Sequence, residues 1–512
     1  MERLASVLGI VVLLGIAYAC SSARRKVPWR LVVVGILLQV WLALFIVRAD
    51  LVPVLLTVAA GGCTLILAVG FLRELPGYWL PAARGLGLLG LFTTLVYAAI
   101  LAGTWWLWPV VLAMLWAATW PGRPARDVIA IVGCVAVLVA IWLMKLPNDF
   151  VFRGVEWVGG EVKHLVDFAI RGADQVFGGL RDAGGFVFAI NVGAIILLFG
   201  GLLSVLYHIG IIPWLVGLMA RVLHRALGVS GAESLAAASN VFVGQTEAPL
   251  VIRAYLPGMT RSEIMALMTG GFATIAGSVL GLYILFLEGA GFGDGAAHLI
   301  AASVMSAPAA FVFAKLFVPE TEISQTRDGA VASQEALGVN LLDALASGVT
   351  AGLKLAVNVV AMLLVFYALI YILNDLVEWI ASWVFGAEGF TFQTLYARLF
   401  QPFAWLIGVP AEDTLAVGEL LGTKTIFNEF IAYERLGGMI KEGEIQTRSA
   451  VLSTYALCGF ANFMSIGIQI AGLGQLAPSK RKVFAQLALR AMVAGALACQ
   501  LTACIVGVIG RF

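Results

Sequence analysis

Two short polar strings carry most of the side chains that could do chemistry in this otherwise apolar chain. They are residues 244–249, with the sequence GQTEAP, and residues 422–430, with the sequence GTKTIFNEF. Each holds one glutamate, Glu247 in the first and Glu429 in the second, beside amides and hydroxyls. A charged side chain at the centre of a bilayer costs about 3 kcal/mol on insertion scales, so an intramembrane glutamate predicts a functional site.

The composition predicts that both strings lie in a membrane. Of the 512 residues, 61% are hydrophobic and only 12% are charged, and the mean hydropathy is +0.98. Apolar runs of roughly 17–25 residues recur, each long enough to cross a bilayer as a helix. The runs are continuous rather than alternating, which excludes a β-barrel. We expect an all-α polytopic membrane protein with about 12 spans, and the net charge of +2 indicates no nucleic-acid partner.

The basic residues predict the orientation of the chain. The first apolar run, residues 4–19, precedes the basic cluster Arg24, Arg25 and Lys26, which is the charge order of a helix whose N-terminus is outside. The same rule alternates consistently along the later loops and places the basic turn at residues 480–482 inside. Both termini are therefore expected outside.

An internal repeat surrounds the two polar strings. The triplet TRS at residues 260–262, followed by GFATI at 271–275, is echoed by TRS at 447–449 and GFANF at 459–463. The predicted topology puts the first triplet inside and the second outside, so the repeat is inverted. Inverted repeats with interrupted helices are the architecture of secondary transporters, which bind solute and ion at the repeat interface.

The strings themselves have the pattern of re-entrant hairpins. Residues 232–256 are interrupted at Gly244 and Pro249, and residues 413–436 at Gly418 and Gly422, so neither reads as an ordinary span. Non-helical backbone at membrane depth is tolerated only when it is buried in protein or lines a cavity. Each hairpin tip can therefore offer free N–H and C=O groups to a solute.

Three motifs closely resemble the concentrative nucleoside transporter family. They are NVFVGQTEAPL at residues 240–250, GTKTIFNEFIAY at 422–433 and CGFAN at 458–462. The resemblance covers residues 1–48 and 150–510. The segment 51–146 departs from it, with about four extra spans that the shorter bacterial members lack. An even number of added spans preserves the downstream topology.

The resemblance implies a multi-pass protein of the plasma membrane bilayer. It implies an elevator-type, homotrimeric importer of nucleosides that is coupled to sodium or to protons and works by alternating access. The chain would divide into N-terminal scaffold spans (1–48), extra membrane spans of unknown role (51–146), an interfacial amphipathic helix (150–182), a scaffold span and interfacial helix (186–230), a first transport repeat with a re-entrant hairpin (231–318), a cytoplasmic loop (319–339), a long scaffold span (340–375) and a second transport repeat with a re-entrant hairpin (385–510).

The resemblance also implies a division of labour within the solute site. Three residues would hold the ribose, namely Glu429, Asn462 and Ser465. Three would hold the base, namely Gln245, Thr246 and Glu247. Two would form apolar walls, Val279 and Phe460, for which the alternative is ordinary helix packing. The glutamates could instead form ion pairs with cations, which we expect nearer the membrane faces: Arg253, Lys424 and Arg435.

The family's sodium site maps onto Asn240, Thr274 and the carbonyls of Val243 and Ile275. Two side-chain oxygens and two freed carbonyls suit a hard cation without adding a fixed charge. Threonine stands at 274 where relatives have serine, and the hydroxyl survives that change. This set of ligands favours sodium over the alternative coupling ion, a proton. No histidine offers an obvious proton relay. No organic cofactor is expected.

Two other classes of protein remain to be weighed. A secondary transporter for a different small polar solute would need a cation or helix N-terminus aimed at an anion, and two intramembrane glutamates oppose an anionic solute. An intramembrane enzyme would need a catalytic constellation, and no Ser/His pair, HExxH motif or paired-aspartate signature is present. The preference for purine or pyrimidine is left open, although Gly244 leaves room near the base.

Overall fold

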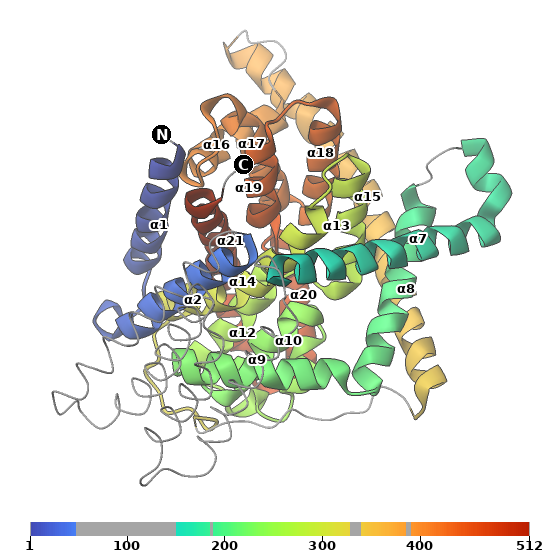
Figure 1. The fold of residues 1–512 in the computed structure, drawn as a ribbon. Helices are drawn as coiled ribbons and strands as arrows, with labels where there is room; N and C mark the ends of the chain where they lie inside the picture. Colours follow the sequence, from blue (N-terminus) through green and yellow to red (C-terminus); the bar gives the residue numbers. More distant parts are fainter. Residues whose placement is uncertain (1, 48–149, 185–187, 328–338, 386–390, 511–512) are drawn as a thin grey trace, which may run out of the picture. The chain divides into compact units, whose positions relative to one another are not determined.

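A computed structural model of the chain describes residues 2–47, 150–184, 188–327, 339–385 and 391–510 (Figure 1). The chain divides into two compact units, and nearly all described residues belong to the unit formed by Met1–Ala43 and Val155–Phe512. The expected extra spans at 51–146 lie outside the described residues.

Every regular element in this part of the chain is a helix, which confirms the all-α fold class for the described residues. The α-helices are α1 (Glu2–Ala19), α2 (Trp29–Val47), α7 (Phe150–Gly184), α8 (Phe188–His208), α9 (Ile211–Leu227), α10 (Gly231–Phe242), α11 (Ala248–Val251), α12 (Arg261–Ala273), α13 (Gly277–Gly289), α14 (Gly295–Phe317), α15 (Leu341–Phe385), α16 (Phe392–Leu406), α17 (Thr414–Ile426), α18 (Glu429–Glu442), α19 (Thr447–Leu457), α20 (Phe463–Leu476) and α21 (Arg481–Ile509). Among the described residues, 6 helical segments are long and apolar enough to span a membrane.

The predicted repeat appears as two copies of one helix order. In the first, α10 and α11 form a hairpin, α12 and α13 a broken helix, and α14 a long helix. In the second, α17 and α18, α19 and α20, and α21 follow in the same order.

The two copies are inverted relative to each other along α21. Arg261, in the first TRS triplet, donates to Gln486 Oε1 at 3.0 Å. Arg448, in the second, donates to the Gly507 carbonyl at 2.8 Å. These two α21 residues are 507 − 486 = 21 positions apart, or about 31 Å of helix at 1.5 Å per residue. The triplets therefore lie at opposite ends of α21, as an inverted repeat requires.

The broken helices end where the backbone becomes extended. Thr274 has φ −112° and ψ 160°, which ends α12, and α13 resumes at Gly277. In the second repeat Gly459 has φ +109°, a conformation that L side chains rarely adopt. A Cβ on Gly459 would also lie 2.6 Å from the Phe272 carbonyl oxygen. The break between α19 and α20 therefore lies directly against the end of α12, and glycine is required there.

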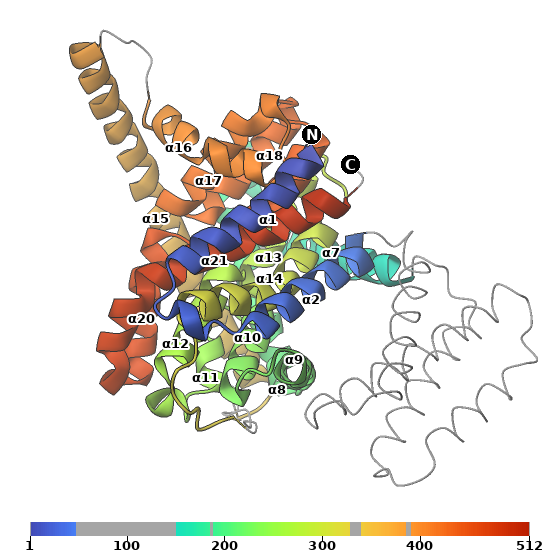
Figure 2. The ribbon, with the colours of Figure 1, turned by 90° about the vertical axis from the view of Figure 1, so that its left-hand side faces the viewer.

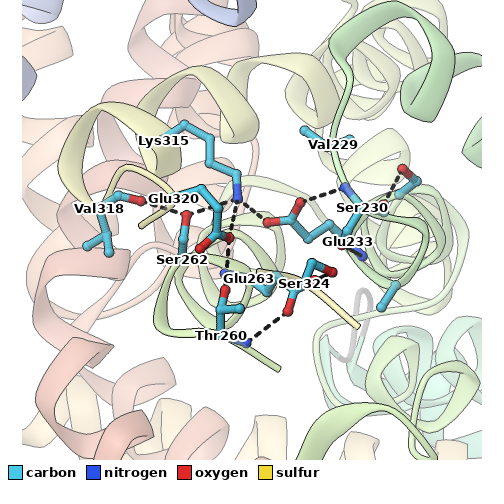
Figure 3. Close-up of polar contacts among 12 residues, drawn as sticks. Val229, Ser230, Glu233, Thr260, Ser262, Glu263, Lys315, Val318, Glu320 and Ser324 are labelled. Atoms are coloured by element: carbon cyan, nitrogen blue, oxygen red, sulfur yellow. Dashed lines mark hydrogen bonds and ion pairs between the residues drawn. The ribbon is translucent and has the colours of Figure 1, made fainter. Parts of the chain in front are cut away.

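A buried polar cluster joins the first hairpin to the broken helix that follows it (Figure 3). Lys315, near the end of α14, forms an ion pair with Glu233 of α10 and donates to Ser262 Oγ of α12 at 2.9 Å. Glu233 also completes the capping box of α10, and Thr260 with Glu263 forms the equivalent box at the start of α12. Both helix N-termini are thus held against the same end of α14.

The remaining helices frame the two repeats. The long helix α15 packs along α8, where a Cβ on Gly348 would lie 2.4 Å from the Gly200 carbonyl oxygen. Such small-residue contacts are typical of helices that associate in membranes. The two chain ends meet, because Arg3 donates to the Gly510 carbonyl at 3.1 Å (Figures 1 and 2). Both termini therefore lie at the same end of this unit.

Candidate solute and cation site

Four non-helical points converge on one cavity of about 480 Å³. Two are the hairpin tips, at residues 244–247 and 427–428, and two are the helix breaks, at residues 274–276 and 458–462. All of the side chains predicted to bind solute line this cavity: Gln245, Thr246, Glu247, Val279, Glu429, Phe460, Asn462 and Ser465. The structure thus brings together residues that are up to 220 positions apart in the chain.

Glu429 is the best-supported of these side chains. It begins α18 and is 5% exposed, and the preceding Asn428 caps the helix by accepting from the Ile431 N–H at 2.9 Å. A helix N-terminus stabilises a negative charge. Tyr283 donates to one Glu429 carboxylate oxygen at 3.0 Å, and Asn462 donates to the other at 2.9 Å. Each oxygen retains a lone pair, so the carboxylate can still accept two hydroxyl hydrogen bonds.

Asn462 is oriented by its own capping role. Its Oδ1 accepts from the Ser465 N–H at 2.8 Å at the start of α20. The amide nitrogen must therefore face Glu429, because the oxygen is already used at the helix end. Asn462, Ser465 and Glu429 form one connected polar wall of the cavity.

The first polar string forms a second, neighbouring part of the cavity wall. Gln245 lies 3.4 Å from Ser465 Oγ and accepts from Gln469 Nε2 at 2.9 Å. Thr246 and Glu247 are exposed within the cavity. Among the described residues, Glu247 has neither an ion pair nor a side-chain hydrogen bond, so its carboxylate is free to accept from a solute.

The described ion pairs do not include Glu247 or Glu429, which disfavours the simple ion-pair interpretation of these residues. Arg435 instead pairs with Glu419 at 3.4 Å and with Glu444 at 3.3 Å. The expectation that Lys424 lies nearer a membrane face is wrong. Lys424 is 2% exposed and donates to the Ala456 and Cys458 carbonyls at 2.9 and 3.2 Å. The break after α19 frees these carbonyls, and they attract the ammonium group into the interior.

Part of the cavity lining was not predicted from the sequence. Tyr283 lies one helical turn after Val279 on α13, so it could have been found from that spacing. The α15 side had a weaker signal, because the helix is apolar nearly throughout and Asn358 is the lone polar side chain in residues 355–363. Gly244 lines the cavity, as its expected place near the base requires. The lining residues that were not predicted are Ala276, Ser278, Tyr283, Leu355, Asn358, Val359, Met362, Leu363, Asn428, Phe430, Met464 and Ile468.

The residues predicted to hold a cation meet where α10 and α12 end. Asn240 and Thr274 are each 1% exposed. The Thr274 hydroxyl donates to the Gly270 carbonyl at 2.9 Å, and a Cβ on Gly270 would lie 3.3 Å from Asn240 Nδ2. Asn240 Oδ1 is buried and has no hydrogen-bond partner among the described residues.

The two carbonyls proposed as cation ligands lie at helix ends. Val243 comes soon after the end of α10, and Ile275 soon after the end of α12. In the described part of the chain, neither carbonyl accepts any of the backbone hydrogen bonds of turns, loops and helix caps. The Thr274 oxygen keeps a lone pair after donating its hydrogen. An orphaned amide oxygen, a hydroxyl and two free carbonyls are oxygen ligands of the kind that a hard cation prefers.

The inverted repeats, broken helices and polar cavity define a secondary transporter. Three family models match the chain: "Na+ dependent nucleoside transporter N-terminus" at residues 8–71, "Nucleoside recognition" at 189–289 and "Na+ dependent nucleoside transporter C-terminus" at 298–507. The first match extends past residue 48, so the resemblance reaches further into the 51–146 segment than the motifs predicted.

Individual relatives agree with these family models. Human "Solute carrier family 28 member 3" is 40% identical over 381 residues, which are 72% of this chain and 54% of that protein. This chain spans about half the length of the first curated relatives that it matches. An "Uncharacterized transporter" of Haemophilus influenzae is 41% identical over 75% of this chain and 92% of its own length.

A solved structure extends the likeness to nearly the whole chain. The structure of CNTnw in an inward-facing substrate-bound state matches with a TM-score of 0.73 and 32% identity, over 99% of this chain and 98% of that one. A variant of CNTnw in an outward-facing state gives the same TM-score. The chain therefore belongs to the concentrative nucleoside transporter family, whose members are transporters and not enzymes.

Proposed function

We propose that the protein imports nucleosides together with Na+ by alternating access. The observation that carries this proposal is that Glu429, held by Tyr283 and Asn462, lines the same cavity as the string from Gln245 to Glu247. A nucleoside is neutral, and it has hydroxyls at one end and a base with donors and acceptors at the other. The two polar walls match these two ends.

The Glu429 wall would hold the ribose. A carboxylate accepts hydroxyl hydrogen bonds that are about twice as strong as neutral ones, and Asn462 and Ser465 add further polar groups to the same wall. Gln245, Thr246 and Glu247 would then hold the base, with Val279 and Phe460 as apolar surfaces beside it. Both apolar residues line the cavity, which supports a wall role beyond helix packing.

The coupling ion would be Na+, held by Asn240, Thr274 and the carbonyls of Val243 and Ile275. The orphaned Asn240 oxygen supports this assignment, because a buried oxygen without a partner is costly unless a ligand satisfies it. A proton is the competing ion. Its candidate acceptor is Glu247, which has no described charged partner.

The transport cycle would move the two hairpins and broken helices against a scaffold that includes α8 and α15. The apolar surface of α15, which includes Leu364, Tyr371 and Trp383, is exposed in the single chain and would face lipid or other copies in a homotrimer. The protein would be a multi-pass protein of the plasma membrane with both termini outside, as the basic clusters indicate.

Radiolabelled uridine uptake into membrane vesicles tests the proposal. A sodium gradient should drive concentrative uptake at constant pH, and replacing sodium with choline should abolish it. Uptake driven by a pH gradient without sodium would replace Na+ with H+ as the coupling ion. Failure to transport any nucleoside under either gradient would refute the proposed function.

A further inference from the structure

We propose that Gln469 fixes which end of the Gln245 amide faces the cavity, and thereby favours nucleosides whose base presents a carbonyl there. The inference rests on the proposed function and gives it a substrate preference. Gln469 lies on α20, is 2% exposed and is not among the residues that line the cavity. It would therefore act as a positioning residue, through Gln245.

The orientation of the Gln469 amide follows from the backbone beside it. Gln469 Nε2 lies 3.2 Å from the Met268 carbonyl oxygen and 2.9 Å from Gln245 Oε1. A carbonyl oxygen can only accept, so the Gln469 atom that faces it must be the nitrogen. The opposite orientation would bring two oxygens together. Because the same nitrogen faces Gln245, Gln245 must turn its oxygen toward Gln469 and its NH₂ group away.

Gly271 holds the amide pair against α12. A Cβ at Gly271 would lie 2.6 Å from Gln469 Nε2 and 2.9 Å from Gln245 Cβ, so both side chains pack directly on the backbone. Gln245 Nε2 reaches Ser465 Oγ only at 3.4 Å, a long contact that uses one of its two N–H groups. The other N–H is available to the cavity that Gln245 lines.

A fixed N–H donor selects for a base acceptor. Glu247, two residues later in the same string, is an acceptor when it is ionised. We place the Gln245 N–H at the exocyclic group of the base and the Glu247 carboxylate at the ring nitrogen beside it, and this order complements C=O beside N–H, as in uracil and hypoxanthine. Cytosine and adenine present the reverse, an amino group beside a bare ring nitrogen. This order would favour oxo-nucleosides over amino-nucleosides, in both pyrimidines and purines.

Calorimetric binding of two nucleoside pairs to the purified full chain tests the inference. Uridine should bind about tenfold more tightly than cytidine, and inosine more tightly than adenosine by a similar factor, as one matched rather than mismatched hydrogen bond predicts. Gln469→Met keeps the side-chain volume but frees the Gln245 amide to turn. Both ratios should then fall to within about twofold.

Two further variants separate positioning from a general loss of structure. Gln245→Met should also abolish the ratios, and adding Gln469→Met to it should change nothing more, because Gln469 acts only through Gln245. The matched control is Gln500→Met, which removes a buried amide of α21 that does not line the cavity and should leave both ratios unchanged. Folding of each variant is checked by its thermal unfolding.

Three results would overturn the inference. Equal binding of both members of each pair by the wild type would show that no fixed donor reads the base. Ratios that persist in folded Gln469→Met would show that another group sets the Gln245 orientation. Binding of none of the four nucleosides by the wild type would refute the proposed function itself, which distinguishes that failure from the other two.

Discussion

Glu429→Gln should weaken uridine binding by about 30-fold. The glutamine keeps the shape of the side chain, and its two amide atoms can still meet Asn462 and Tyr283, whose hydroxyl can turn to accept. The ribose diol, however, loses a charged acceptor. A hydrogen bond to a charged group stabilises by about 1 kcal/mol more than a neutral one. Two hydroxyls therefore lose about 2 kcal/mol, or about 30-fold in Kd.

The assay compares uridine with 2′,3′-dideoxyuridine, which has no diol. Calorimetry on purified wild type and Glu429→Gln should show the full loss for uridine and no more than about twofold for the dideoxy analogue. Glu419→Gln is the matched control, because Glu419 pairs with Arg435 and does not line the cavity. An equal loss for both ligands in Glu429→Gln would refute the ribose assignment and indicate a structural role for the carboxylate.

The remaining predictions address sodium coupling, protein stability and the role of residues 51–146. Thr274→Val should raise the sodium concentration for half-maximal uridine uptake before it lowers maximal uptake. In the wild type, sodium should lower the nucleoside Kd by about 5- to 150-fold. Nucleoside binding that does not depend on sodium would refute the sodium assignment. Lys315→Met should lower the unfolding free energy by about 3–5 kcal/mol because it leaves Glu233 buried and unpaired. Adding Glu233→Gln to this variant should restore part of the lost stability in a thermal melting assay in detergent. If stability does not recover, the two side chains are not energetically coupled. Single cysteines along residues 51–146 should show no protection by nucleoside from a thiol reagent, whereas protection at several positions would place the block at the solute site.

The polar strings could be predicted from the sequence because their signal is local. Glycine, proline and charged residues inside apolar runs are rare enough to mark a break, and each of the strings at 244–249 and 422–430 carries a glutamate beside the break. The repeated TRS triplet also gave the inversion, since positive charges alternate from one side of the membrane to the other.

The positions of Lys424 and the α15 wall could not be predicted in the same way. A buried lysine normally signals an ion pair, but Lys424 is held by carbonyls that a break more than thirty residues later sets free. The α15 wall gives little periodic signal because all faces of a long apolar helix read alike. Gln469 was missed for a related reason, because its effect reaches the cavity only through a second side chain.

The cavity has a polar wall from the two repeats and an apolar wall from α15. This division affects how fast the solute-bound protein could move its site from one membrane face to the other. Among the residues that the structure describes, the charged groups on the cavity wall belong to the two repeats, whereas α15 contributes Leu355, Val359, Met362 and Leu363 with the amide of Asn358. A solute held by the repeats would therefore keep its strong hydrogen bonds while the apolar side chains of α15 pass alongside it. Dispersion contacts between such surfaces are individually weak and re-form at each new position. In the proposed transport cycle α15 would form no strong bond to the solute that must break, and the barrier would lie in moving protein through lipid rather than in releasing the solute.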